Sequence, residues 1–129
     1  MEQLSLKTLI TRLINDIIPV MVTKNTLLIN DVPQHLAVTE NKKMIGTVLS
    51  NLFAALAVHA SETCIRITAK AFGNVIWLQL KDQKLINTTF IAQSIQDIQP
   101  VAEGMGGYIG ITSHHDVETT IVFSFPIAA

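Results

Sequence analysis

The sequence predicts an α+β fold, a two-layer sandwich in which one mixed β-sheet carries helices on one face. Three observations predict it. Apolar residues recur at helical spacing in some stretches, they alternate at strand spacing in others, and helices and strands are grouped rather than strictly alternating. A chain of 129 residues is long enough for one domain with one substantial core. We therefore expect a single domain over residues 1–129.

The first helix is expected over residues 4–21. Its apolar residues recur at steps of three and four, which is typical of an amphipathic helix with a wide apolar face, and Pro19 is expected to stop it. Two short extended pieces then follow, at residues 25–33 and 35–38. They precede the most apolar segment of the chain.

The central helix is predicted from the run TVLSNLFAALAVHA at residues 47–60, and either Thr39 or Asn41 can cap its start. Residues 44–61 carry no charge over a length of eighteen residues. This is about the lower limit of length for a membrane-spanning helix. The polar side chains in this stretch would all need partners inside a bilayer, so a buried core helix is favoured and no membrane insertion is expected. Asn51 is then a buried amide whose presence needs a reason.

A β-hairpin is predicted after the central helix. Residues 63–71 alternate between apolar and polar, a Gly-Asn turn signal follows at 73–74, and residues 75–82 resume the alternation. The second strand directs Asp82 to the apolar face and Trp77 to the opposite face. An aromatic side chain among polar neighbours is a modest indication of an interface.

The last part of the chain predicts a helix and a second hairpin. Pro100 is expected to kink the helix at residues 88–107 or to split it in two, and strands are expected at 108–113 and 119–127. The apolar side of this helix is predicted to carry Phe90, Ile91, Ile95 and Ile98.

Composition and charge exclude several functional classes. The formal net charge is −1 and no basic run stands out, so we expect no nucleic-acid partner. Cys64 is the only cysteine, which excludes a disulfide framework and predicts a small buried hydrophobe. The polar turn at 114–118 contains adjacent histidines, which rarely point at one ion, so no metal site is expected. The N-terminus forms no signal-peptide apolar region, so a cytoplasmic location is expected.

Four stretches then carry a family resemblance. NLFAAL at 51–56, with Asn41 before it, resembles N-L-L-x-N-A, and DQKLI at 82–86 stands where D-x-G-x-G is expected. MGGYIGITS at 105–113 resembles h-G-G-x-I-x-V-x-S, and TTIVFSFP at 119–126 resembles the end of G-T-x-F-x-F-x-L-P, with Glu118 in place of its glycine. Together, over nearly the whole chain, they resemble the ATP-binding domain of sensor histidine kinases. This domain belongs to the histidine kinase-like (GHKL) ATPase superfamily, shared with gyrase, the ninety-kilodalton heat-shock chaperone and MutL-type repair proteins.

The resemblance implies a nucleotide pocket whose phosphate side is changed here. In the family, the first asparagine of the helix motif lies beside the phosphates and the second helps to hold Mg²⁺. Asn51 matches the first, but the second position is Ala55, which cannot ligate a metal. The family's nearby lysine and hydroxyl correspond to Val58 and Ala60.

The base side and the lid of that pocket are changed as well. Asp82 matches the aspartate that binds the adenine amino group, but the glycines of its motif correspond to Lys84 and Ile86. A second glycine-rich segment corresponds to residues 92–95, which contain no glycine. Only residues 84–88 separate Asp82 from the next helical pattern, so the ATP lid is expected to be deleted. Asn51, Ala55 and Asp82 are therefore expected to mark a vestigial nucleotide pocket.

The resulting hypothesis is a degenerate histidine kinase-type domain that neither binds nor hydrolyses ATP. We expect it to lack the family's phosphoacceptor helical hairpin and its ATP-dependent kinase activity. ATP and Mg²⁺ are implied by the resemblance alone. We expect it to act in two-component signal transduction as a protein-interaction module, with a histidine kinase, a response regulator or its own copy as the partner.

Two alternatives stay open. The first is a functional nucleotide-binding domain that works with a missing partner, supported by Asn51, Asp82 and the glycines at 106–107. The second is a small-molecule sensor in which Ala55, Val58 and Ala60 line an apolar pocket on the former phosphate side.

Overall fold

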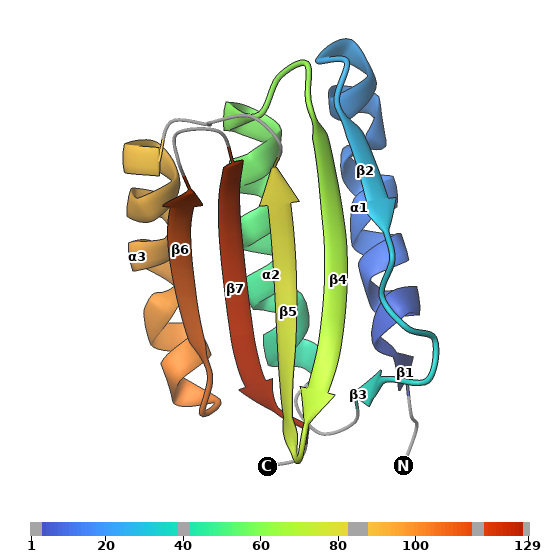
Figure 1. Ribbon diagram of the computed structural model, residues 1–129, viewed down its shortest axis with the longest axis vertical. Coiled ribbons are helices and arrows are strands. Elements are labelled where there is room, and N and C mark those ends of the chain that lie inside the picture. Colours follow the sequence, from blue (N-terminus) through green and yellow to red (C-terminus); the bar gives the residue numbers. More distant parts are fainter. Residues whose placement is uncertain (1–3, 39–41, 83–87, 115–117, 128–129) are drawn as a thin grey trace.

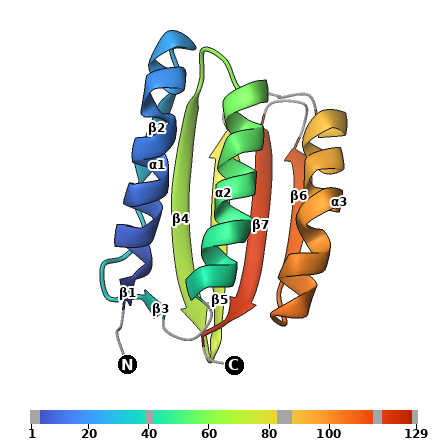
Figure 2. The same ribbon diagram turned by 180° about the vertical axis from the view of Figure 1, so that it is seen from behind.

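The computed structural model describes residues 4–38, 42–82, 88–114 and 118–127. Within these residues, three helices lie on one face of a five-stranded sheet, as Figures 1 and 2 show from opposite sides. The helices are α1 (Leu6–Thr23), α2 (Lys42–His59) and α3 (Thr88–Gly104). The strands are β1 (Leu4–Ser5), β2 (Leu27–Asn30), β3 (Ala37–Val38), β4 (Cys64–Phe72), β5 (Val75–Asp82), β6 (Tyr108–His114) and β7 (Glu118–Pro126).

The main sheet is mixed, as predicted. Its order is β2-β4-β5-β7-β6, in which β2 runs parallel to β4 and every other neighbouring pair of described strands is antiparallel. A two-residue turn joins β4 to β5, with Gly73 at a φ of 62°, which confirms the Gly-Asn turn signal. The two edges of this sheet are β2 and β6.

A second, smaller sheet was not predicted. Leu4 and Ser5 were expected to begin the first helix, but they form β1 and pair with β3. The helix starts at Leu6, whose backbone N–H donates to the Leu36 carbonyl at 2.8 Å. Strands of two residues are too short to show alternation in the sequence, which is why this pairing had no signal.

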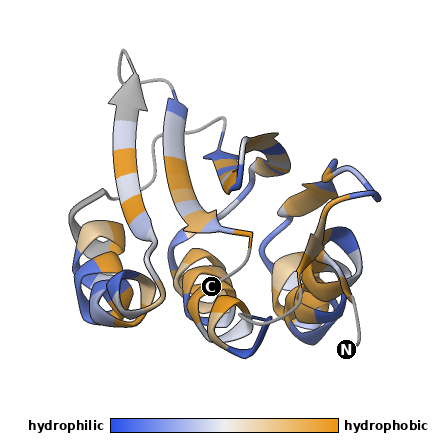
Figure 3. Cartoon of the chain, turned by 90° about the horizontal axis from the view of Figure 1, so that it is seen from below, coloured by the Kyte–Doolittle hydropathy of each residue, from blue (hydrophilic) through white to orange (hydrophobic). Residues whose placement is uncertain are grey.

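The core lies between the sheet and the helices. Figure 3, which looks along the sheet from below, separates the two layers. The inward faces of the central strands are buried as their alternation predicted, and α2 packs over them with its own buried face. The largest fully buried side chains include Phe53, Phe123, Phe125, Leu49, Leu52 and Leu56. Cys64, expected to be buried, is only partly so.

Neither proline within a helix ends or divides it. Pro19 was expected to stop the first helix, but α1 continues past it to bury Met21, and Pro100 lies inside one unbroken α3. A proline leaves the carbonyl four residues before it without its helical hydrogen bond. Those carbonyls belong to Asn15 and Gln96, two exposed residues, so water can hydrate them. Packing of the opposite, apolar faces then holds both helices together.

Other predictions have mixed outcomes. Trp77 lies on the open face of the sheet, opposite Asp82, with 46% of its surface exposed, and its ring meets that of Phe72 edge-on at a centroid distance of 5.8 Å. The predicted caps of the central helix, Thr39 and Asn41, lie outside the described residues. Within the described part of the chain, no helix is both long and apolar enough to cross a membrane.

Candidate functional site

Asn51 is exposed, so the predicted buried amide is wrong. Its side-chain Nδ2 donates to the Thr47 carbonyl at 2.8 Å, one turn earlier in α2. The apolar run that suggested burial extends around the whole helix. Leu52 and Leu56 face the core, whereas Val58 is 68% exposed on the outer face. The amide therefore needs no ligand and no core partner, since its own helix satisfies one donor and water reaches the rest.

A cavity of about 270 Å³ lies between α2 and α3 and brings part of the predicted site together. Asn51 and Ala55, which the family resemblance assigns to the phosphate side, both line it. Asp97 faces it from α3, and no Lys or Arg belongs to its described lining. The remaining lining residues are Ala54, Val58, His59 and Ser94.

The glycine-free segment at 92–95 lies inside α3 and not at its start. Only the first four N–H groups of a helix lack an intrahelical partner, and α3 begins at Thr88. The backbone N–H groups from Ala92 onward therefore bond within the helix. This segment has no backbone donors to offer a phosphate. Ala60, the other residue matched to the phosphate side, is fully buried and lies outside the described lining of the cavity.

Asp82 is placed apart from the α2/α3 cavity. It is 2% exposed at the end of β5, and the Thr63 hydroxyl donates to its Oδ1 at 2.5 Å. Asp82 is not among the described residues that line the cavity. The loop that follows it, with Lys84 and Ile86, lies outside the described residues. The three predicted site residues thus divide into a cavity pair and one buried carboxyl group.

Two threonines beside Asp82 were missed as site residues. Thr119 faces Asp82 across the β5–β7 ladder and is 1% exposed, and its hydroxyl has no hydrogen-bond partner among the described residues. Thr63 precedes β4, and the register of the β4–β5 hairpin pairs Ile65 with Asp82. That register places Thr63 diagonally across from Asp82 on the same face. The two-residue turn at 73–74 fixes this register, so it was a usable sequence signal.

Among the described residues, no group of three or more His, Cys, Asp or Glu side chains could hold a metal ion. This finding does not test the predicted turn with the adjacent histidines, because His115 and Asp116 lie outside the described residues.

Comparisons with known proteins show the fold. No protein-family model matches the chain, and no curated protein matches it either. Histidine kinase AdeS from Acinetobacter baumannii matches with a TM-score of 0.81 at 12% identity, over 98% of this chain and 66% of that one. The nucleotide-free catalytic domain of histidine kinase ThkA matches at 0.74 and 16% identity, over 99% and 97%.

A third structure, full-length ShkA in complex with AMPPNP, matches with a TM-score of 0.79 at 13% identity, over 99% of this chain and 31% of that one. ThkA has also been solved in complex with the response regulator TrrA. This chain therefore spans less than two thirds of AdeS and about a third of ShkA. It has the fold of a histidine kinase ATP-binding domain, a histidine kinase-like ATPase fold.

Proposed function

We propose that this domain uses the histidine kinase ATPase fold as a non-catalytic protein-interaction module in cytoplasmic signal transduction, and that it neither binds nor hydrolyses ATP. The observation that carries the proposal is the chemistry of the α2/α3 cavity. Ala55 and Val58 line it where the family resemblance expects a Mg²⁺ ligand and a lysine. A triphosphate would find no oxygen ligand for its metal at Ala55 and no cation at Val58.

Charge opposes a phosphate in this cavity. Asp97 contributes a carboxyl group to the lining, and the described lining holds no Lys or Arg to offset it. Two unit charges about 4 Å apart repel by about 1 kcal/mol in bulk water and more where water is partly excluded. A triphosphate carries several negative charges, so this repulsion is repeated for each of them.

Size and position also oppose nucleotide binding. Pockets for small molecules and cofactors usually enclose about 300–1,000 Å³, and this cavity holds about 270 Å³. Its described lining does not extend to Asp82, which is the residue expected to recognise the base. We further propose that the short segment after Asp82 leaves the domain without an ATP lid.

Protein partners fit the composition and the fold. Hydrophobic residues make up 49% of the chain, and several large ones are exposed on its surface. They include Val20, Val22, Leu27, Phe72, Trp77 and Tyr108. A neighbour in fold, ThkA, forms a complex with a response regulator. We therefore propose a histidine kinase, a response regulator or a second copy of this chain as the class of partner.

One observation favours a second candidate function, a nucleotide-binding domain that works with a missing partner. Asp82 is kept at the base position, and the buried hydroxyl of Thr119 beside it has no hydrogen-bond partner among the described residues. A buried polar atom of this kind would gain from a ligand that brings a donor or acceptor. The small-molecule sensor is not supported, since it requires an apolar pocket. The polar side chains of Asn51 and Asp97 line this cavity, and Ala60 lies outside its described lining.

Thermal unfolding with and without millimolar Mg-ATP, backed by calorimetric titration, separates the two candidates. A ligand at about 100 times its dissociation constant stabilises a fold by about 2.7 kcal/mol, or roughly 5–15 °C for a domain of this size. We expect no shift and no titration heat. Full-length ShkA, which binds AMPPNP, serves as the positive control. A saturable shift would overturn the proposal in favour of the second candidate.

A further inference from the structure

The open face of the main sheet, which is turned toward the viewer in Figure 1, gathers exposed aromatic side chains. The described helices all lie on the opposite face (Figure 2). Phe72, Trp77 and Tyr108 occupy outward positions of their strands and are 58%, 46% and 59% exposed. Within the described residues, no other Phe, Tyr or Trp side chain is exposed. Aromatic side chains are enriched in protein interfaces, so this face is the candidate surface for a partner.

The strand register places two of these aromatics in one row with a lysine. Trp77 pairs with Lys70 on β4 and with Ser124 on β7. Ser124 in turn pairs with Tyr108 on the edge strand β6. The row therefore crosses four strands, and the small side chain of Ser124 separates the two rings.

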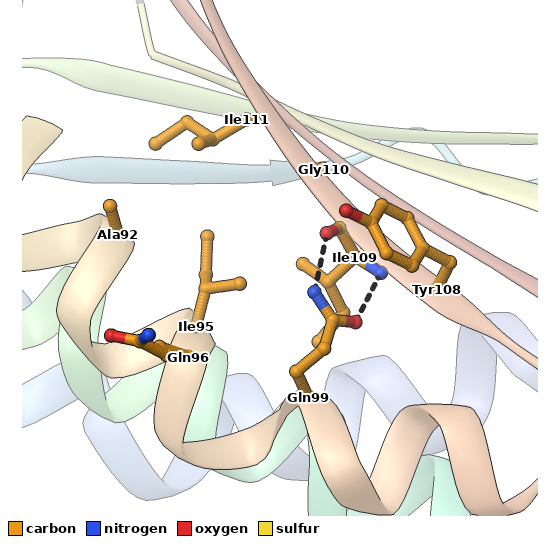
Figure 4. Close-up of a pocket in the computed structure, with 8 residues that line it drawn as sticks. All are labelled: Ala92, Ile95, Gln96, Gln99, Tyr108, Ile109, Gly110 and Ile111. Carbon is orange, nitrogen blue, oxygen red and sulfur yellow. Dashed lines mark hydrogen bonds between the residues drawn. The ribbon is translucent and has the colours of Figure 1, made fainter.

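Gln99 fixes the outer end of this row. Its side-chain Nε2 donates to the carbonyl of Ile109, the residue after Tyr108, at 2.9 Å, and the Ile109 N–H donates to Gln99 Oε1 at 2.8 Å (Figure 4). These two bonds tie the edge strand to α3. A surface that is already ordered loses less conformational entropy when a partner binds.

A hollow of about 220 Å³ lies at the lysine end of the row. Its lining consists of Thr68, Ala69, Lys70, Phe72, Trp77 and Gln79. The rings of Phe72 and Trp77 meet edge-on at a centroid distance of 5.8 Å and supply its apolar part. Pockets for small molecules usually enclose at least about 300 Å³. The hollow is therefore suited to one side chain of a partner and not to a cofactor.

The charge on this face is positive. The outward positions of β4 and β5 carry Arg66, Lys70 and Lys81. Arg66 forms an ion pair with Asp31, whereas the two lysines have no ion-pair partner among the described residues. Glu118, at the far end of β7, is the only acidic residue at a described strand position of this face.

We propose that the open face of the sheet binds an acidic segment of a protein partner. Two of its carboxylates pair with Lys70 and Lys81, and one aromatic or large apolar side chain enters the hollow beside Trp77. Four residue steps separate the rows of the two lysines, which is about 13 Å along the strands. An extended segment bridges them with two acidic residues four positions apart. The inference rests on the proposed interaction role and names the surface and the charge of the partner.

A second copy of this face does not supply the carboxylates. Sheets that pack face to face and aligned keep their strands within about 30° of each other. In such a two-fold dimer, each residue lies opposite its own row when the axis follows the strands, and opposite its own strand when the axis crosses them. Glu118 shares neither a row nor a strand with Lys70 or Lys81. Both arrangements therefore leave the lysines opposite neutral or positive groups.

Nucleic acid and anionic lipid need more positive charge than this face offers. Affinity for nucleic acid depends on the number of phosphates that the protein neutralises. Two unpaired lysines, on a chain with a formal net charge of −1, neutralise few of them. A protein segment with two carboxylates matches the two lysines in number.

Selection from a phage library of random dodecapeptides, against the full chain, tests the proposal. We expect the enriched peptides to be acidic and to carry an aromatic or large apolar residue. Trp77 is the only tryptophan of the chain, so its fluorescence reports on this face. Synthetic copies, with phenylalanine in place of any tryptophan, should shift its emission to shorter wavelength. They should also bind more weakly at about 0.5 M salt than at about 0.05 M salt.

Two substitutions on the face and one matched control locate the contact. Trp77→Ala should weaken peptide binding about tenfold or more by calorimetry, and Lys70→Glu should weaken it about fivefold. Lys43→Glu makes the same change of charge at an exposed position of α2, in the helix layer, and should bind within about twofold of the wild type. Circular dichroism and the melting temperature of each variant show whether the fold is intact.

Three results for the peptides would overturn the proposal: no enrichment of acidic sequences, binding that leaves Trp77 fluorescence unchanged, or binding that neither Trp77→Ala nor Lys70→Glu weakens. Tighter binding of a thymidine oligonucleotide, or of vesicles of phosphatidylserine and phosphatidylcholine, would assign the face to nucleic acid or lipid. A dimer of the wild type that Trp77→Ala abolishes would assign it to a second copy.

This inference and the proposed function can fail separately. Peptides that bind without changing Trp77 fluorescence would overturn the inference and leave the interaction role standing. Titration with Mg-ATP tests the α2/α3 cavity, which lies in the helix layer, and its result does not alter the reading of the peptide experiment.

Discussion

The two halves of the expected nucleotide pocket differ in burial. On the base side, Asp82 lies inside the sheet, where Thr63 bonds it and Thr119 faces it. On the phosphate side, Asn51 and Val58 lie on the outer surface of α2, and Ala55 between them is buried. A buried polar group has partners that depend on it, so its replacement disturbs the fold. An exposed helix position can change with little cost to stability, and a binding surface can therefore be lost while the fold stays.

The largest expected effect is on the base side. Asp82→Ala leaves the half-buried hydroxyl of Thr63 without its acceptor and opens a small space beside β5, and we expect a loss of about 3 kcal/mol in the free energy of unfolding. Urea denaturation measures it. Asp82→Asn, which keeps an acceptor for Thr63, is the matched control and should lose less. A loss below about 0.5 kcal/mol for Asp82→Ala would show that Asp82 is not structural.

Gln99 on α3 is another polar side chain whose hydrogen-bond partners depend on it. Its side chain is partly buried and satisfies two backbone groups of Ile109, so Gln99→Ala should cost about 1–3 kcal/mol. The amide of Ile109 should also exchange faster with deuterium. Gln99→Glu keeps the acceptor for the Ile109 N–H but loses the donor to the Ile109 carbonyl. Its free energy of unfolding should lie between those of the wild type and Gln99→Ala. Unchanged exchange at Ile109 in Gln99→Ala would contradict the bonding described.

Restoring family-like side chains on the phosphate side sharpens the comparison. The double variant Ala55→Asn with Val58→Lys should lose about 1–3 kcal/mol in the free energy of unfolding, most of it at Ala55, which is 9% exposed and belongs to the core, because Val58 is 68% exposed. We expect no Mg-ATP binding by calorimetry, since Asp97 and the helical segment at 92–95 are unchanged. Mg-ATP binding by the double variant but not by the wild type would show that Ala55 and Val58 alone account for the absence of binding.

The smallest expected effect is at Asn51. Asn51→Ala removes only a hydrogen bond within its own helix, at an exposed position where alanine has the higher helix propensity. Stability should stay within about 0.5 kcal/mol of the wild type. A loss above about 1 kcal/mol would mean that the amide has a further partner, and would break the contrast with Asp82.

The sequence predicted most of the fold because alternation and turn chemistry are local. The β4–β5 hairpin, the inward direction of Asp82 and the burial of Ile91, Ile95 and Ile98 on α3 all follow from spacing, while the side chain of Phe90 lies outside the described part. Asn51 was misplaced because apolar residues surround it on every side of α2, including Ala54 and Val58 on the outer face. In such a run the spacing does not reveal which face packs against the sheet.

Other features depended on contacts between distant segments. The bond of Gln99 to Ile109 joins a helix to an edge strand, and no pattern in either segment indicates it. Pro19 was expected to stop α1, but the helix continues past it. Buried residues before and after Pro19 in the chain pack against the core, and this packing outweighs one lost hydrogen bond. Of the candidate site, the pairing of Asn51 with Ala55 was predicted, and the cluster of Thr63 and Thr119 around Asp82 was not.

The most direct test of the central claim is a titration of the ¹⁵N-labelled domain with Mg-ATP, followed by the backbone amide signals of Asn51, Ala55 and Asp82. If the domain does not bind nucleotide, as proposed, these residues should show no saturable change up to millimolar ligand. Saturable shifts at all of them together would contradict the account. They would show that the two halves of the pocket still act as one nucleotide site.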